Sequence, residues 1–304
     1  MGLTPMSDVL AIDIGGTNIK VGLVDNKSQL SQQQSYPTPT LFADFTMLLN
    51  TIKQAYVPHD YRGVAVSSPG IPLSSGMIGA DSAVPYLHEH NILNLFKRTF
   101  HLPVTIENDA NCAALAEIWS GNARTEKNVA TLIIGTGIGG AIIQDRKIFH
   151  GNHHHAGDFG YMLFPTETGE LSVFSRLAST SSIIRYVAKK KAEPVSSWSG
   201  EKVFELAKAK DPICQEAIDR FYSMLSLGIY NIQYVYDPDV ILIGGGISSR
   251  KELLDELRSR LITIQTETPE KLVVPKVMVC YHKNHANLLG AAYHFMISGE
   301  VTDK

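Results

Sequence analysis

The sequence has few of the features that mark secreted, zinc-binding or membrane proteins. Among 304 residues there are three cysteines, Cys112, Cys214 and Cys280, which are far apart and form no CxxC pair. Scattered thiols are typical of a reducing compartment and argue against a disulfide framework or a structural zinc site. No run of about 18 apolar residues is present, so no membrane span is predicted.

The sequence also has no large excess of positive or negative charge. The formal net charge is −3, which gives no electrostatic reason to expect nucleic acid or a membrane surface as a partner. The longest basic run, Lys189 to Lys191, is short and is interpreted as a solvated helix end. The first eight residues are polar and lead directly into an apolar run, so we expect no signal peptide and a cytoplasmic location.

The overall composition is that of a globular protein. A strand–glycine–strand pattern occurs twice in the sequence. Apolar residues make up 44% and charged residues 19%, and the length allows two domains. The run 9–14, the turn 15–18 and the run 19–24 predict one hairpin. Residues 129–134, 135–140 and 141–144 predict another. Each hairpin alone would be ordinary, but a pair suits a nucleotide held between two related domains.

Glycine turns of this kind can bind phosphate because backbone N–H groups approach the oxygens closely. Asp13, at the end of the first strand, is a candidate Mg²⁺ ligand, directly or through water; its alternative is a turn-capping aspartate. The second turn contains GxGxxG, yet a strand follows it where a dinucleotide-binding fold needs a helix. No Walker loop is present either.

A third glycine site lies near the end of the chain. Residues 239–243 predict a strand, Gly244 to Gly246 follow, and Ser248 and Ser249 are expected to cap a helix over 251–261. Such a turn offers a flat surface to an adenine or ribose. Further helices are expected over 111–119, 181–191, 200–208, 212–234 and 286–297.

The segment 104–111 is predicted as a strand that runs into a helix. It places Asn108 and Asp109 at the carboxyl end of the strand, where open α/β folds bind ligands. Asp109 is the candidate base that accepts a hydroxyl proton, and Asn108 would bond a neighbouring hydroxyl. The alternative is a helix-capping pair without a catalytic role.

Five motifs, in this order along the chain, resemble the ROK family of sugar kinases and related repressors, and the resemblance runs from Leu10 to about Tyr293. They are IDIGGTN (12–18), ENDANCAALAE (107–117), IGTGIGG (134–140), AGDFGY (156–161) and ILIGGGIS (241–248). The resemblance implies an α/β, two-lobed actin-like ATPase fold of the hexokinase/actin type, with ligands in the interdomain cleft. We expect a small N-terminal lobe of residues 1–115 plus 286–304 and a large C-terminal lobe of 116–285.

The resemblance also implies roles for individual residues. The first phosphate loop would comprise Gly15, Gly16, Thr17, Asn18 and Lys20. The second would comprise Gly135, Thr136, Gly137, Gly139 and Gly140. The adenosine side would be formed by Gly244, Gly245 and Gly246. The sugar would bind to Ser68, Pro69, Gly70, Asn108, Asp109 and Asp158, with Asp109 as the base that activates its 6-hydroxyl.

The sequence departs from the family at the anomeric end of the sugar. Asp158 stands where glutamate is usual, Tyr161 where a histidine zinc ligand is usual, and Ser175 where a second glutamate is expected. The CxCGxxGC zinc cluster is missing, and residues 169–180 contain no cysteine or histidine. The run His153 to His155 is interpreted as a loop and not as a metal site.

The glycine turns, Asp109 and the resemblance to the ROK family together imply an ATP-dependent carbohydrate kinase, a phosphotransferase with an alcohol group as acceptor, which uses Mg²⁺. The sequence also resembles bacterial β-glucoside kinases that lack the zinc cluster. This resemblance and the shortened residues at the anomeric end favour a β-glucoside such as cellobiose as substrate; N-acetylmannosamine kinase, glucokinase and fructokinase are the alternatives. A sugar-responsive transcriptional regulator is disfavoured because only eight residues precede the first strand. Family members often form dimers, so a homodimer is expected.

Overall fold

The computed structural model describes residues 8–79, 82, 84–166, 168–268 and 273–299. The chain divides into two compact units: Met1–Arg124 with Asn284–Lys304, and Thr125–Lys283. The expected boundary after residue 115 would cut a helix that the structure shows as continuous, so the first unit extends further than expected. The N-terminal segment 1–7 lies outside the described residues.

The first unit is built on a five-stranded sheet. In spatial order its strands are β3 (Leu30–Pro37), β2 (Asn18–Val24), β1 (Asp8–Ile14), β4 (Tyr61–Ser68) and β7 (Val104–Asn108). β1 pairs antiparallel with β2, and β2 with β3, whereas β4 and β7 run parallel to β1. A small hairpin, β5 (Ile71–Pro72) and β6 (Ile78–Gly79), leaves the end of β4.

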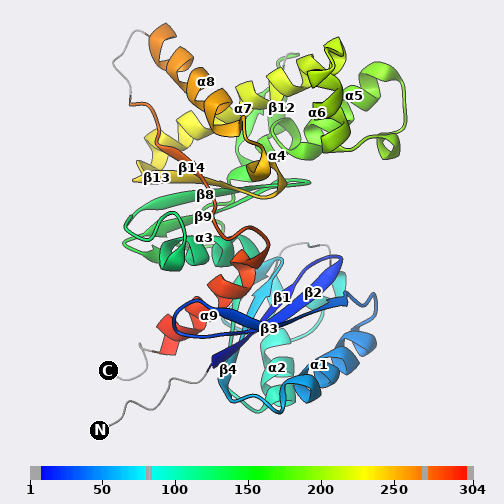
Figure 1. Ribbon diagram of the computed structural model, residues 1–304, viewed down its shortest axis with the longest axis vertical. Helices are drawn as coiled ribbons and strands as arrows, with labels where there is room; N and C mark the ends of the chain where they lie inside the picture. Colours follow the sequence, from blue (N-terminus) through cyan, green and yellow to red (C-terminus); the bar gives the residue numbers. More distant parts are fainter. Residues whose placement is uncertain (1–7, 80–81, 83, 167, 269–272, 300–304) are drawn as a thin grey trace. The chain divides into compact units, whose positions relative to one another are not determined.

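Helices cover this sheet because its strands alternate side chains between two faces. They are α1 (Phe42–Tyr56), α2 (Ile92–Phe100), α3 (Asp109–Ser120) and α9 (Ala286–Gly299), with 3₁₀ turns η1 (Pro85–His88) and η5 (Lys283–His285). Leu10, Ile12 and Ile14 of β1 lie in one buried cluster with Phe45 of α1 and Phe96 of α2. α9 packs on β1 and β4 and against α3, so Figure 1 shows its red ribbon beside strands from the other end of the chain.

The second unit repeats the same strand pattern. Its sheet has the order β10 (Lys147–Ile148), β9 (Ile138–Gln144), β8 (Val129–Ile134), β13 (Val240–Gly244) and β14 (Val277–Val279). Again three strands form an antiparallel meander and two more run parallel to the first of them. The two hairpins that the glycine patterns predicted, β1–β2 and β8–β9, are therefore confirmed.

One large apolar core fills the second unit. Its helices are α4 (Phe174–Leu177), α5 (Thr180–Lys191), α6 (Gly200–Lys208), α7 (Pro212–Tyr236) and α8 (Leu253–Glu267). Leu132 of β8 and Ile243 of β13 are buried among side chains of these helices, Phe174 and Phe221 included. A second hairpin, β11 (Leu163–Pro165) and β12 (Leu171–Val173), and three 3₁₀ turns, η2 (Phe159–Tyr161), η3 (Val195–Ser197) and η4 (Gly246–Ser249), complete the unit.

The helix after the third glycine site begins later than predicted. A 3₁₀ turn occupies 246–249, and α8 starts at Leu253 with Glu252 in the N-cap position and no capping side chain. The predicted serine cap is wrong, because Ser248 and Ser249 donate their hydroxyls back to the carbonyls of Gly245 and Gly246. No helix among the described residues combines the length and apolar character needed to cross a bilayer.

Candidate active site

The backbone of the turn between β1 and β2 is fixed by hydrogen bonds, whereas the residues at its tip are exposed. Gly15 N–H donates to the carbonyl of Asn18 at 3.1 Å. Thr38, which follows β3, donates its hydroxyl to Gly15 O at 2.6 Å and its N–H to Thr17 O at 2.9 Å. Gly16, Thr17 and Asn18 are exposed. The turn thus presents three residues to a ligand on a fixed backbone.

Asp13 lies beneath this turn with only 6% of its surface exposed. Its Oδ1 accepts hydrogen bonds from Ser67 Oγ at 2.9 Å and from Asn287 Nδ2 at 3.0 Å. Burial raises the pKa of the Asp13 carboxyl, while these two bonds and the nearby Lys20 ammonium act in the opposite direction. Lys20 is the cross-strand partner of Asp13, and its Nζ lies 3.4 Å from Asn284 O.

Asn108 ends β7 and caps α3, as one of the sequence alternatives predicted. Its Oδ1 accepts from the N–H groups of Ala110 at 2.9 Å and Asn111 at 3.2 Å. Its Nδ2 donates to Gly70 O at 2.9 Å. The capping role and the contact with the Ser68–Pro69–Gly70 turn therefore occur together, so a single side chain joins two predicted sugar-binding segments.

Asp109 is the first residue of α3, and its Oδ1 accepts from Ala110 N–H at 2.8 Å. Burial raises the pKa of Asp109 to about 6, and the negative charge of Asp13 acts in the same direction. Hydrogen bonds, chiefly the one from Ala110 N–H, lower it in part. A carboxyl with a pKa close to neutral is well suited to accept a proton and release it again.

Glu107 supports this segment, and sequence reasoning assigned it no role. It is 4% exposed, and its Oε1 accepts from the backbone N–H of Asn108 at 2.7 Å and from Asn111 Nδ2 at 2.9 Å. His294 of α9 places Nδ1 3.9 Å from Glu107 Oε2. The first acid of the ENDAN motif thus fixes the strand end on which Asn108 and Asp109 stand.

The turn after β4 has a conformation that favours glycine. Ser68 is buried and donates its hydroxyl to Pro69 O at 3.1 Å. Gly70 has φ of 85°, and a Cβ there would lie 2.7 Å from the Ile78 side chain and 2.8 Å from Gly79 O. The turn is therefore packed tightly on the β5–β6 hairpin.

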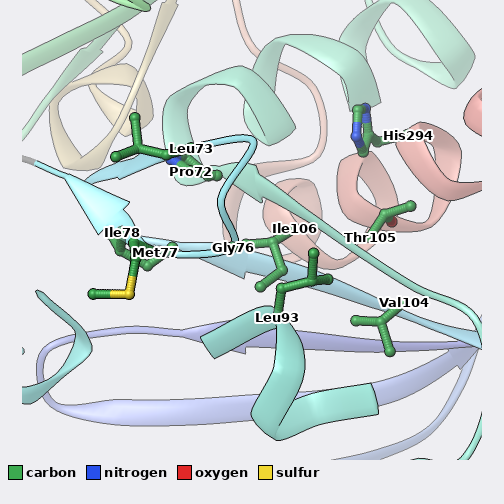
Figure 2. A pocket seen from close by; sticks show the side chains of 10 residues that line it. All are labelled: Pro72, Leu73, Gly76, Met77, Ile78, Leu93, Val104, Thr105, Ile106 and His294. Carbon is green, nitrogen blue, oxygen red and sulfur yellow. The ribbon is translucent and has the colours of Figure 1, made fainter. Parts of the chain in front are cut away.

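A pocket of about 190 Å³ lies beside this hairpin but does not contain the predicted site. It is lined mainly by apolar side chains from the β5–β6 hairpin, α2 and β7, with His294 at one side: Pro72, Leu73, Gly76, Met77, Ile78, Leu93, Val104, Thr105, Ile106 and His294. Figure 2 shows it along the part of β7 that precedes Asn108. None of the residues expected to bind sugar or phosphate lines it.

In the second unit the β8–β9 turn is similarly braced. Gly135 N–H donates to Gly137 O at 2.9 Å, and Thr180 N–H, at the start of α5, donates to Gly135 O at 3.0 Å. Thr136 and Gly137 are exposed at the tip of the turn. On β9, Gly139 is partly exposed and buried Gly140 lies against the backbone of Gly157.

The third glycine site, Gly244 to Gly246, packs against the β8 end of the β8–β9 turn. Gly245 has φ of 80°, and a Cβ on it would overlap the carbonyl oxygen of Ile134, the last residue of β8. Gly244 is buried against Ile133, whereas a Cβ on Gly246 would meet no atom within 4 Å. Two of the three predicted glycine segments are thus brought together within the second unit.

Ser175 forms hydrogen bonds with the backbone of β9 that the sequence did not predict. Its Oγ accepts from Ile138 N–H at 2.8 Å and donates to Ile138 O at 3.2 Å. The hydroxyl is therefore bound to the start of β9, next to the glycine turn, and a Cβ on Gly160 would lie 2.5 Å from it. The Ser175 hydroxyl therefore braces the β8–β9 turn, while its place at the anomeric end of the sugar stays a prediction.

Asp158 has its own partner in the histidine-rich loop. His155 Nδ1 lies 2.7 Å from Asp158 Oδ2, and the side chains are 56% and 35% exposed. Elsewhere in the described part of the chain, as here, no three His, Cys, Asp or Glu side chains are placed to hold a metal ion together.

We expect the protein to fold without zinc. His155 in the histidine loop contacts the Asp158 carboxylate, and a site with one histidine and one carboxylate lacks the four ligands of structural zinc. Elemental analysis of protein purified without added metal should find well under one zinc per chain, and a chelator should leave the melting temperature in place. One zinc per chain, lost together with stability on chelation, would contradict this.

Comparison with known proteins matches the chain along almost its whole length. The model of the ROK family matches residues 9–296. A β-glucoside kinase from Listeria innocua is 34% identical over 95% of this chain and 97% of its own length. One from Klebsiella pneumoniae is 33% identical over 94% and 95%. The crystal structure of a ROK family protein from Streptococcus pneumoniae in complex with sucrose is 36% identical, with a TM-score of 0.88 over 97% and 99%. The predicted actin-like ATPase fold is confirmed.

Proposed function

From the chain's membership of the ROK family, and from the geometry of its glycine turns and Asp109, we propose that the protein is an ATP-dependent sugar kinase acting on β-glucosides. The observation that carries the proposal is Asp109, a partly buried carboxyl at a helix start whose pKa is raised to about 6. In the reaction a sugar hydroxyl, which we take to be the 6-hydroxyl, attacks the γ-phosphorus of ATP. The bond to the β,γ-bridging oxygen breaks, ADP leaves, and Asp109 accepts the hydroxyl proton.

The glycine turns suit the phosphates of ATP. Phosphoryl transfer depends mainly on positioning and charge neutralisation. The exposed turn from Gly16 to Asn18 and the exposed tip at Thr136 and Gly137 each offer backbone N–H groups on a braced backbone. We assign the adenosine side to Gly244 to Gly246, where a bare glycine surface is available.

Asp13 is the residue that fits a magnesium ion. Both hydrogen bonds that it accepts fall on Oδ1, which leaves Oδ2 for the ion or one of its waters. Magnesium in kinases is often held by one or two carboxylates and the phosphates themselves. The ion would supply neutralisation of phosphate charge, while Ser67 and Asn287 hold the carboxylate in place.

A glycoside is favoured over a free sugar by the residues at the anomeric end. Glutamate would place a carboxylate on a free hydroxyl in a charge-assisted hydrogen bond. Asp158 is one methylene shorter and is already paired with His155, and Ser175 is turned to Ile138. Two glycoside kinases are similar to this chain over nearly its full length, and a similar structure holds a disaccharide.

The substrate assignment predicts a rank order. In an assay of ADP release, cellobiose or another β-glucoside should exceed glucose, N-acetylmannosamine and fructose in kcat/KM. Asp158→Glu should shift the preference toward free glucose, because a buried or aligned carboxylate penalises a substrate that lacks its partner hydroxyl. A tenfold or greater advantage for a free sugar would refute the β-glucoside assignment and leave the kinase assignment standing.

We also place the protein in the cytoplasm and expect it to be a homodimer. The three cysteines are buried free thiols, which suits a reducing compartment. We infer the dimer because members of the family often form dimers. Small-molecule sugar and ATP are the ligands that this proposal requires.

A further inference from the structure

The β11–β12 hairpin carries an apolar face that is open to solvent. Tyr161, Leu163 and Leu171 are 73%, 60% and 67% exposed. The residues between them point the other way: Met162 packs against the core of the second unit and Phe164 is buried in it. Pairing of Pro165 with Leu171 adds Pro165 to the same side. We call Tyr161, Leu163, Pro165 and Leu171 the hairpin face.

This face begins one turn away from Asp158. The 3₁₀ turn η2 connects the two, and Tyr161 N–H donates to Asp158 O at 3.1 Å. This bond makes Tyr161 and Asp158 neighbours, and their exposed fractions, 73% for Tyr161 and 35% for the Asp158 side chain, put both on the solvent side of the turn. Phe159 and Gly160, between them, are buried, which fixes the direction in which that side faces.

Three contacts hold η2 and the residues before it in place. Gly160 lies against Ser175 Oγ, which is itself bonded to Ile138 of the β8–β9 hairpin. Gly157, with φ of 92°, lies against the backbone of Ala141 on β9. His155 holds the Asp158 carboxylate at 2.7 Å. Tyr161 is therefore an exposed aromatic ring on a rigid support, which lowers the entropy lost when a ligand binds to it.

We propose that the hairpin face, with Tyr161 as its first residue, is the subsite for the β-linked group of the substrate, either a second pyranose or an aromatic aglycone. The inference rests on the proposed function and goes beyond it, because it assigns the part of the substrate that is not phosphorylated. Asp158 meets the glucose unit near its anomeric carbon, and a group linked through that carbon extends over the side of η2 that Tyr161 occupies. The ring supplies an apolar face with a hydroxyl at its tip, which suits a sugar ring or an aryl group.

The alternative occupant is a second copy of the chain. Exposed apolar side chains are common in interfaces. The glycoside is favoured because the face begins at Asp158 and because a similar protein binds a disaccharide. A contact between copies would give no reason for the aromatic residue to sit three positions from a predicted sugar ligand.

The test compares Tyr161→Ala and Tyr161→Phe with the wild type. For each, kcat/KM is measured with an aryl β-glucoside, with cellobiose and with glucose, each at saturating ATP. We expect Tyr161→Ala to lower the ratio of glycoside to glucose kcat/KM by about tenfold, mainly through KM of the glycoside, as loss of an aromatic contact implies. Tyr161→Phe should keep most of the ratio, because the ring remains. Tyr234→Ala, which removes another exposed tyrosine of the same unit, is the matched control and should keep the wild-type ratio.

Each other outcome has a definite meaning. A ratio within twofold of wild type in Tyr161→Ala overturns the subsite, as does an equal loss with glucose and glycoside. A fall in the mass of the particle in solution, with the ratio intact, would show that the face joins two copies and would also overturn it. If the wild type phosphorylates no sugar at all, the proposed function fails instead, so the two failures are distinguishable. Melting temperatures of both variants establish that they are folded.

Discussion

Asp109→Asn is expected to lower kcat by about 10²–10⁴-fold, the usual contribution of a general base. Asparagine keeps the oxygen that accepts the Ala110 N–H bond but cannot accept the hydroxyl proton. KM for ATP should change little, because the assigned phosphate turns are separate from this side chain. Asp44→Asn, an exposed aspartate on α1, is the control and should turn over at the wild-type rate. More than a tenth of wild-type turnover in Asp109→Asn would reject the base.

The same residue should set the acid limb of the wild-type pH profile. Burial and the Asp13 charge raise the pKa of Asp109 from 3.8 to about 6, so the carboxyl is protonated below that pH and cannot act as a base. Activity should therefore fall as the pH drops through about 6. A limb near 3.8 would mean that the carboxyl is in an ordinary, water-like environment. The limb should be missing from the residual activity of Asp109→Asn.

Gly245→Ala is expected to lower the free energy of unfolding by about 2–4 kcal/mol, because it combines a strained backbone with a steric overlap. The residue has φ of 80° and ψ of −176°, a region open essentially to glycine alone. A Cβ there would also overlap the carbonyl oxygen of Ile134. Movement of that strand end would disturb the β8–β9 turn, so KM for ATP should rise as well.

Gly246→Ala is the matched comparison for stability. It lies one residue further on, without a left-handed φ and with no atom within 4 Å of a new Cβ. Denaturant unfolding should therefore place Gly246→Ala within about 0.5 kcal/mol of the wild type, as for most unstrained surface changes. If both substitutions lower the free energy of unfolding equally, the backbone conformation of Gly245 is not the cause of the loss in Gly245→Ala.

Features encoded by neighbouring residues were predictable from the sequence. The β1–β2 and β8–β9 hairpins follow from apolar alternation interrupted by glycine, which is a local signal. The strand that ends at Asn108 and the helix that it caps are equally local. For this reason the predicted helices over 181–191 and 200–208 also match α5 and α6 closely.

Contacts between residues distant in sequence were not predictable. Asp13 is held by Ser67 and Asn287, which come from β4 and α9 and belong to no common motif. Ser175 was judged by its position in a motif, yet it bonds Ile138, 37 residues away. The serines after Gly246 resemble helix caps, but the positive φ of Gly245 turns the chain into a 3₁₀ turn first. Glu107 could have been suspected, since an acid at a strand end beside Asn108 rarely lacks partners.

The most direct test of the central claim is to identify the product. The protein is incubated with ATP, Mg²⁺ and cellobiose, and the mixture is analysed by mass spectrometry and ³¹P NMR. The account predicts one ADP for each cellobiose consumed and a disaccharide that gains a single phosphoryl group at a primary 6-hydroxyl. Hydrolysis of ATP without a phosphorylated sugar, or no reaction with cellobiose and every other sugar supplied, would contradict it.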